Sequence, residues 1–217
     1  MAEGCARRFI AWTMYAACAS LPDIASAADF RLGGFGTAGY AVSSRDLTYL
    51  RYIDDRGTVK ADSLLGVQAE VQFGPRWGLT AQAVAGTPRN RDEDLDIDLR
   101  WAFVSFRPSN DSLIRAGRLR PPIFVHTQNA EVGVTYDQVR LPAEVYGTSP
   151  VYDLDGIAIN KIWLTAGDSE IDAEAYWGKS DVAFRDHFQR DPPARYFPER
   201  ITATGLVLSY QSSSLLL

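Results

Sequence analysis

Apolar and polar residues alternate one by one over several stretches of the chain, most regularly at 67–73, 77–83, 95–103 and 171–177. In one of these stretches the apolar positions are Leu95, Ile97, Leu99, Trp101 and Phe103. Successive side chains of a strand point to opposite faces, so this period predicts strands with one apolar and one polar face. No stretch of comparable length follows a helical period.

The pattern predicts eight strands, at 30–44, 63–73, 77–85, 95–106, 112–118, 152–164, 169–178 and 200–210. The connections between them are long and short in strict alternation. A soluble two-sheet sandwich explains the alternation of side chains but not that of the connections. An up-and-down transmembrane barrel explains both, because its short turns face the periplasm and its long loops face outside. We therefore expect an all-β chain forming an antiparallel, up-and-down transmembrane β-barrel.

In such a barrel the apolar face contacts lipid and the polar face lines the lumen. We expect the lipid-facing set to include Val71, Leu99, Trp101 and Trp177. We expect the lumen-facing set to include Glu70, Gln72, Asp98 and Arg100. The two faces of the strands at 152–164 and 200–210 are not assigned, since their alternation is irregular.

The N-terminal residues 1–27 have the order of a secretory signal peptide. Arg7 and Arg8 precede an apolar run at 9–21, and small residues follow at 25–27. The apolar run is shorter than the roughly twenty residues of a membrane-spanning helix. We expect cleavage after residue 27 and a mature domain at 28–217.

Both cysteines, Cys5 and Cys18, fall within this leader, so the mature domain has no disulfide, thiolate ligand or cysteine nucleophile. The net charge of −5 argues against a nucleic acid as partner. No later stretch reaches the roughly eighteen apolar residues of a transmembrane helix. A closed hydrogen-bonded sheet is a structure that stabilises an exported domain without disulfides.

Three other motifs carry little weight. Residues 34–39 spell GxGxxG, but no buried apolar strand precedes them as a dinucleotide-binding fold requires. His126 and His187 are the only histidines and have no second metal-ligating histidine or cysteine nearby. The acidic run at 91–98 does not have glycine and glutamate at the positions that a calcium loop requires. We therefore predict no enzymatic activity, no cofactor and no metal site.

The stretch at 111–156 is the most informative part of the sequence. A short strand runs into Pro121 and Pro122, which cannot donate to a strand ladder, and about thirty residues without any period follow. Basic residues lie where the chain leaves the strand, namely Arg115, Arg118 and Arg120. Acidic residues follow along the segment, namely Glu131, Asp137, Glu144, Asp153 and Asp155. A loop of one charge facing a wall of the other predicts a pore constriction.

Parts of this stretch resemble the third-loop region of the general, trimeric porins of Gram-negative outer membranes. The resemblance rests on 139–147 (VRLPAEVYG), on 117–122 (GRLRPP) before it and on 153–156 (DLDG) after it. The strand at 30–40, with GGFGTAGY, is similar to the first strand of that family. Over the remainder of 28–217 the resemblance is loose.

The resemblance implies a sixteen-stranded, trimeric barrel whose third loop, here about 119–151, folds inward and narrows the pore. It places Arg118 and Arg120 on the barrel wall, and Asp137 and Glu144 on the loop. Together with the charge pattern, it predicts a pore lining of Glu70, Asp98, Arg100, Arg115, Arg118, Arg120, Asp137, Arg140 and Glu144. Eight strands are half of such a barrel, so we expect an N-terminal fragment that forms an open, curved sheet.

The expected function is passive diffusion of small hydrophilic solutes or ions across the outer membrane of a Gram-negative bacterium, with outer-membrane lipid as a partner. Two alternatives stay open. One is a closed eight-stranded barrel that acts as a structural or adhesive module. The other is a lipid-hydrolysing barrel enzyme, which needs a serine and a histidine within reach of each other. A conductance measurement distinguishes the diffusion channel from the structural or adhesive module.

Overall fold

The structure is a computed structural model and describes residues 28–46, 52–88, 95–138, 140–147, 149, 151–165, 169–185 and 196–212. The expected signal peptide at 1–27, His187, and residues 91–94 of the acidic run lie outside the described residues.

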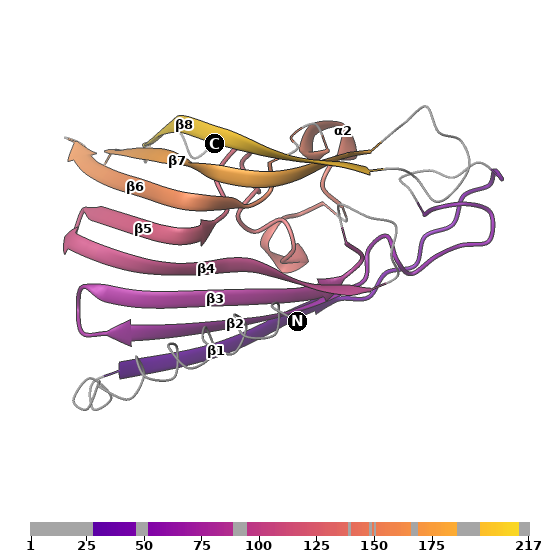
Figure 1. The fold of residues 1–217 in the computed structure, drawn as a ribbon, viewed down its shortest axis with the longest axis horizontal. Helices are drawn as coiled ribbons and strands as arrows, with labels where there is room; N and C mark the ends of the chain where they lie inside the picture. The colour runs from indigo at the N-terminus through magenta and orange to yellow at the C-terminus, as the bar shows by residue number, and fades with distance from the viewer. Residues whose placement is uncertain are drawn as a thin grey trace, which may run out of the picture.

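Eight strands form one antiparallel sheet in chain order. They are β1 (Ala28–Thr37), β2 (Leu64–Phe73), β3 (Trp77–Gly86), β4 (Asp96–Ser109), β5 (Ser112–Leu119), β6 (Leu154–Thr165), β7 (Ser169–Arg185) and β8 (Tyr196–Gln211). Each strand pairs with the next, while β1 and β8 are the two edges and are not paired with each other in the described part of the chain (Figure 1). The expected all-β class and the open, antiparallel, up-and-down sheet of eight strands are confirmed.

Strand limits agree with the prediction except at β1, β7 and β8. The first strand ends at Thr37 rather than 44, because Ala41 leaves the sheet and bridges to Thr58 within the β1–β2 connection. Strands β7 and β8 extend beyond 178 and before 200 as a long hairpin. Lys179, Ser180 and Asp181 lie in this extension, and their polar side chains hide the strand from a hydrophobicity pattern.

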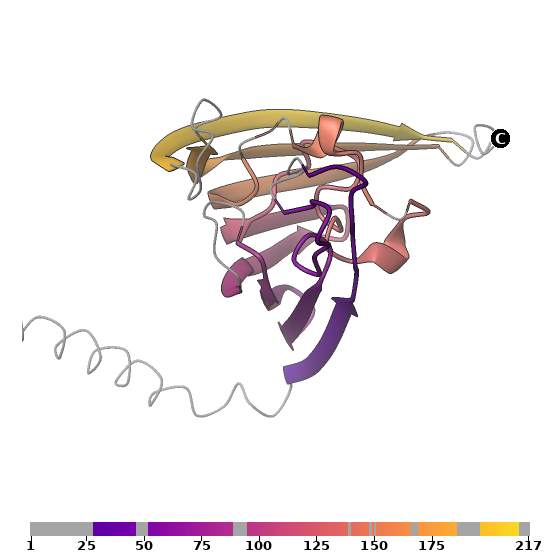
Figure 2. The same cartoon turned by 90° about the vertical axis from the view of Figure 1, so that its right-hand side faces the viewer.

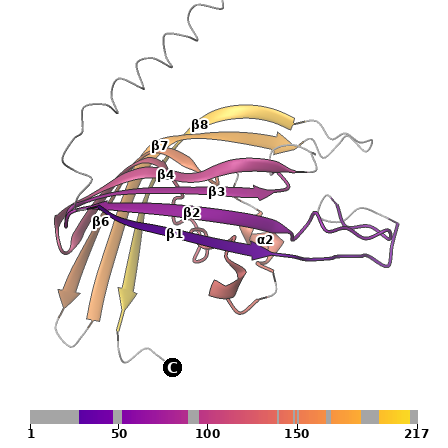
Figure 3. The same ribbon diagram turned by 90° about the horizontal axis from the view of Figure 1, so that it is seen from below.

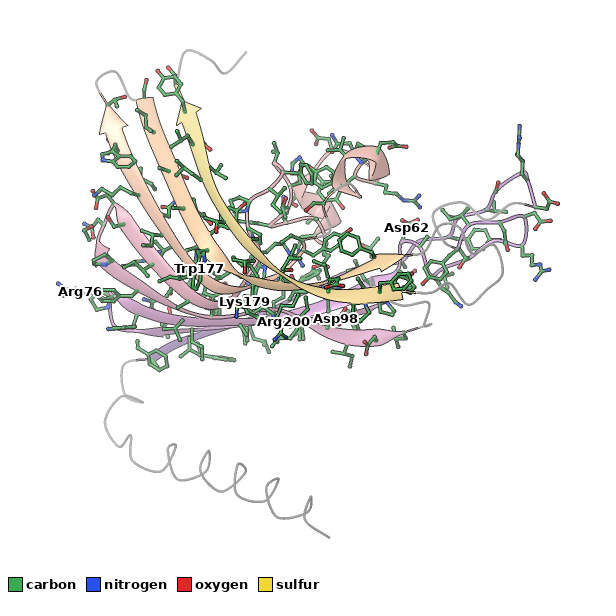
Figure 4. All side chains as sticks on the ribbon, turned by 45° about the horizontal axis from the view of Figure 1, so that its top comes forward. Asp62, Arg76, Asp98, Trp177, Lys179 and Arg200 are labelled. Carbon is green, nitrogen blue, oxygen red and sulfur yellow. The ribbon has the colours of Figure 1, made fainter. Side chains whose placement is uncertain are left out.

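Tight turns lie at one end of the sheet and long connections at the other (Figures 1 and 3). The β2–β3 turn uses Gly74 with φ of 64°, a conformation that glycine adopts without a steric cost. Figure 4 shows Arg76 at this turn end, and Asp62 beside the long connections at the opposite end. We call these two ends the turn end and the loop end.

The sheet curves into an arc, and the β5–β6 connection lies on its concave side (Figure 2). This connection, residues 120–153, is called the long loop below. It contains the 3-10 turn η2 (Gly133–Thr135) and the short helix α2 (Ala143–Tyr146). No helix in the described residues is long and apolar enough to cross a membrane.

Gly117 shows how tightly neighbouring strands approach beneath the long loop. Its φ is 133°, and a Cβ atom there would lie 2.3 Å from the carbonyl oxygen of Ala102 in β4. A side chain at this position therefore clashes with the backbone of the adjacent strand. Glycine at 117 permits the close approach at the place where the sheet bends around the loop.

The buried apolar side chains form a small core between the long loop and the concave face. They include Leu119, Val151, Leu154, Ala158 and Val182. The convex face has the opposite character, because its apolar side chains are exposed. Large exposed members on this face are Phe30, Leu32, Leu65, Val67, Trp77, Leu79, Ile97, Leu99, Val104, Ile157, Ile159, Trp177, Leu206, Leu208 and Tyr210.

A β-bulge in β4 corrects one expectation about the faces. Ala83 pairs with Leu99 and Gln82 pairs with Trp101, so Arg100 is an extra residue that shifts the alternation. Trp101 therefore lies on the concave face with Gln82, and the expectation that it shares the convex face with Leu99 is wrong. Phe103 moves with it, since its ring lies 6.0 Å from that of Trp101.

The other expected faces agree with the strand register. Val71 pairs with Leu79 and Trp177 pairs with Ile157, which places both on the convex face. Glu70, Gln72, Asp98 and Arg100 lie on the concave face.

Candidate functional site

The long loop begins where β5 ends at Leu119 and is held first by its own turns. Pro121 is fully buried and ends the strand ladder, because proline has no backbone N–H. The Thr127 hydroxyl accepts a hydrogen bond from the Phe124 amide at 2.7 Å, and the Phe124 ring packs 5.2 Å from that of Tyr146. The hollow between these groups measures about 60 Å³, which suits a few water molecules rather than a solute.

Four charged side chains join the loop to the sheet, and we call them the charge ring. Arg100 comes from the β4 bulge, Arg120 and Asp153 from the two ends of the loop, and Glu131 from its middle. Glu131 lies 3.0 Å from Arg100 and 3.1 Å from Arg120. Asp153 closes the ring at 3.5 Å from Arg120 and 3.7 Å from Arg100. Positive and negative groups alternate around it.

The charge ring is largely removed from solvent. The side chains of Arg120, Glu131 and Arg100 are 2%, 6% and 8% exposed. Buried ions are costly unless each has a partner, and here every arginine contacts two ring acids, while Arg100 also contacts Asp98 at 3.2 Å. The Nε atom of Arg120 is buried and has no hydrogen-bond partner within the described residues. The ring therefore holds the loop by ion pairs, one of which is also a hydrogen bond that Arg120 donates to Glu131 at 3.1 Å.

The far side of the loop reaches the β1–β2 connection. Arg140 forms a bidentate ion pair with Asp62, with 2.8 Å between Arg140 Nε and Asp62 Oδ1. Burial raises the pKa of the Tyr136 phenol, and the negative charges of Asp62 and Glu131 raise it further. Tyr136 thus lies between the two anchor points. The loop crosses the concave side from β4 to the end of β1.

The concave wall below the loop is lined by hydrogen-bonded polar side chains. Gln82 donates to Gln68 at 2.7 Å, and Gln68 donates to Glu70 at 2.6 Å. On the other half of the wall, Arg115 lies 2.6 Å from Glu174. A similar contact joins β6 to β7, where the Asn160 amide donates to the Asp172 carboxylate. This face is polar between the turn end and the loop.

Arg118 is the predicted site residue that the structure places elsewhere. It pairs in register with Ala102 and Asp155, and its guanidinium donates to Asp155 at 2.8 and 2.9 Å on the convex face. The alternation explains this, because Arg115 faces the concave wall and Arg118 is three residues further along the same strand. The expectation that Arg118 faces the acids of the long loop is therefore corrected, whereas Arg120 does contact two of them, Glu131 and Asp153.

Asp137 and Glu144, the two loop acids predicted for the pore lining, do not contact the arginines. Asp137 and Glu144 are exposed and form no ion pair within the described residues. The contacting acids are Glu131 and Asp153 in the ring, Asp62 with Arg140 and Glu174 with Arg115. Glu131 and Asp153 are visible in the sequence as loop acids, but no local pattern distinguishes them from Asp137 and Glu144. Asp62 and Glu174 are distant in sequence from their partners.

No group of three or more histidine, cysteine, aspartate or glutamate side chains in the described ranges is arranged to hold a metal ion. Comparison with known proteins gives no relative: no family model, no curated protein and no solved structure matches the chain. The functional argument therefore rests on the residues and their geometry.

Proposed function

We propose that this chain forms the wall of an outer-membrane diffusion channel for small hydrophilic solutes or ions. The observation that carries the proposal is the convex face, which exposes large apolar side chains on seven of the eight strands, all except β5. Ile97, Leu65 and Leu206 are 72%, 68% and 65% exposed, and no helix of the described residues covers them. An exposed apolar face of this kind is stable in contact with the acyl chains of a lipid bilayer.

A soluble protein is the competing interpretation, and its energetics are unfavourable. Each large aliphatic or aromatic side chain left in water forgoes about 1.5–3 kcal/mol of burial energy. Soluble monomers rarely expose a continuous apolar surface of this extent. The small core under the long loop does not compensate for it, since most large apolar residues of the sheet lie on the other face.

The concave face has the properties of a channel wall. It is polar, and the long loop crosses it between two ionic anchors, the charge ring and the pair of Arg140 with Asp62. A loop held in this way narrows the passage without taking part in the strand ladder. Permeation then needs no chemical step, and selectivity depends on pore width and on the charges along the wall.

The charges of the wall favour cations. Arg100, Arg115 and Arg120 each contact at least one carboxylate. The carboxylates of Glu70 and Asp172 instead accept hydrogen bonds from neutral amides, and neither forms an ion pair with a cation among the described residues.

The proposed channel is wider than a cylinder of these eight strands. The interior of an eight-stranded barrel is filled by its own side chains, whereas this sheet carries the long loop on its concave face. Edge strands β1 and β8 are not paired with each other in the described residues, which leaves both edges able to pair with further antiparallel strands. We propose that this sheet is part of a larger barrel, in the trimeric arrangement that its resemblance to porins implies.

The assignment of the two faces is testable with neighbouring residues. Leu206 lies on the convex face of β8, and Val207 lies on the concave face opposite Glu174. We expect Leu206→Arg to destabilise the membrane-inserted protein by about 2–4 kcal/mol, the cost of arginine at the lipid midplane, and Val207→Arg to cost much less. Urea unfolding from lipid vesicles measures both. Equal effects, or a larger one for Val207→Arg, contradict a lipid-facing convex surface.

The channel itself is tested by adding the assembled larger barrel that contains this sheet to a planar lipid bilayer. We expect stepwise conductance that favours potassium over chloride under a salt gradient. Stable insertion with no conductance refutes the channel and favours a structural or adhesive module.

A further inference from the structure

Five charged residues interrupt the apolar convex face near the loop end of β5 to β8. We call Arg118, Asp155, Lys179, Asp181 and Arg200 the convex charged patch. Arg118, Asp155 and Lys179 occupy one row of paired residues, and Asp181 pairs with Arg200 in the next row on that face. Figure 4 shows Lys179 and Arg200 on the adjacent strands β7 and β8.

Two of the three basic residues in the patch are matched by a carboxylate. Arg118 binds Asp155 in a bidentate pair at 2.8 and 2.9 Å, and Arg200 binds Asp181 in the same way at 2.6 and 2.9 Å. Lys179 is exposed and forms no ion pair among the described side chains. The patch therefore carries a surplus of one positive charge, located on the ammonium group of Lys179.

The distance of the convex charged patch from the turn end places it near the boundary of the proposed membrane. At the turn end, Trp163, Ile171 and Tyr210 form one row of the convex face, with both aromatic rings exposed. Strand rise places Lys179 about 26 Å along β7 from Ile171, or about 20 Å in height at the usual tilt near 40°. The lipid-facing band of such barrels is about 25 Å tall. Lys179 thus lies just below the upper edge of this band, where its long side chain reaches the level of the polar head groups.

We propose that the convex charged patch binds the anionic phosphate of a lipid head group in the leaflet on the loop side. This inference rests on the proposed membrane location. Lys179 supplies the attracting charge, and the guanidinium N–H groups that Arg118 and Arg200 do not use toward their carboxylates are further donors. The exposed indole of Trp177, one position below Lys179 on the same face, contacts the boundary between head group and acyl chain.

A lipid phosphate fits these observations better than a second protein surface. The patch has a net positive charge in a row whose other charges are already paired, which suits one small anion. A protein partner that covers the patch has to bury both exposed ion pairs, at a desolvation cost that pairing within the patch does not return. A head group leaves them in contact with water.

The test compares Lys179 with a second lysine of the same face. Lys161 also lies on the convex face, at the turn end, where Asp111 neutralises it. The full chain in neutral detergent is titrated with phosphatidylglycerol, and bound lipid is counted by native mass spectrometry. We expect Lys179→Gln to weaken binding about fivefold, the usual effect of one basic residue near an anionic lipid surface. Lys161→Gln leaves binding unchanged, and Lys179→Arg retains it.

Several results overturn this inference. An unchanged affinity in Lys179→Gln excludes Lys179 as the binding group, and an equal loss in Lys161→Gln shows unspecific attraction. Competition by inorganic phosphate at the same concentration shows an anion site rather than a lipid site. A protein dimer or trimer that Lys179→Gln dissociates identifies a second copy as the partner. Failure of the chain to insert into phosphatidylcholine vesicles instead refutes the proposed membrane location.

Discussion

Replacing Glu131 by glutamine is the most direct test of how the long loop is held. The substitution keeps the shape of the side chain but removes the negative charge that lies nearest to both Arg100 and Arg120. Each contact is close to 3 Å, which corresponds to about 5 kcal/mol at an effective permittivity of about 20. The energy recovered by no longer burying the Glu131 carboxylate offsets a large part of this.

Breaking a buried ion pair by removing one partner costs about 3–5 kcal/mol. We expect the lower end for Glu131→Gln, because Asp153 and Asp98 still contact the arginines. The loop lies outside the strand ladder, so the loss appears as detachment of the loop rather than as unfolding of the sheet. A loss of about 3 kcal/mol corresponds to loop opening that is about a hundredfold more frequent.

Hydrogen exchange in detergent micelles measures this opening at individual amides. The amides of Thr127, Val132 and Thr135 donate to carbonyls within the loop at 3.0, 2.9 and 2.9 Å and report on it directly. In Glu131→Gln we expect their exchange to accelerate about a hundredfold while amides of β4 and β5 keep their rates. Asp137→Asn and Glu144→Gln remove exposed loop acids and are the matched controls, with no expected change.

The reasoning also predicts that a second substitution compensates. Within the charge ring, Glu131→Gln leaves two arginines with one acid, Asp153. Adding Arg120→Gln leaves Arg100 with Asp153, so the ring is neutral again and part of the protection returns. Unchanged exchange in Glu131→Gln refutes the view that the charge ring holds the loop. Equal acceleration in loop and strands shows instead that the ring supports the whole sheet.

Two further predictions concern the wall and the turn end. Asp172→Asn removes a carboxylate of the concave wall that binds an amide rather than a cation, so we expect the reversal potential to shift toward anion selectivity. Arg118→Gln on the convex face leaves the reversal potential unchanged. A shift with Arg118→Gln alone contradicts the assignment of faces. The hydrogen bond from Lys161 holds the pKa of Asp111 well below its ordinary value of 3.8. This pair therefore contributes stability above pH 3.8 that is lost only as the pH falls through the lower pKa of the folded state, and Lys161→Gln raises that pKa in a carboxyl NMR titration.

The strands were predictable because apolar and polar residues alternate with period two in the sequence, as the two faces of the sheet do in the structure. Five of the eight strands agree within three residues at each end, which matches the usual uncertainty of limits predicted from sequence. The β7–β8 hairpin was underestimated because Lys179, Ser180 and Asp181 are polar. Such residues extend a ladder through backbone hydrogen bonds, which no side-chain pattern reports.

The partners of the site residues were less predictable than their presence. Arg120 and Glu131 are eleven residues apart, and nothing local indicates that Glu131 rather than Asp137 turns toward the arginines. Arg118 illustrates a second limit. It precedes Arg120 by two positions, so both have the same parity, yet Arg118 pairs within β5 whereas Arg120 lies beyond the end of the strand and turns to the concave side.

The bulge at Arg100 connects the two proposed surfaces of the chain. Without an extra residue, strict alternation from Leu99 places Trp101 and Phe103 on the convex face and sends Arg100 inward with no change of parity. With the bulge, Leu99 remains exposed on the convex side, Arg100 contacts Glu131 of the loop, and Trp101 lies on the concave wall beside Gln82. One irregular residue thus lets β4 contribute to the apolar surface, to the anchor of the loop and to the lining of the passage. Bulges recur where a strand has to redirect a side chain, and Trp101 is the residue that this one moves from the convex to the concave face.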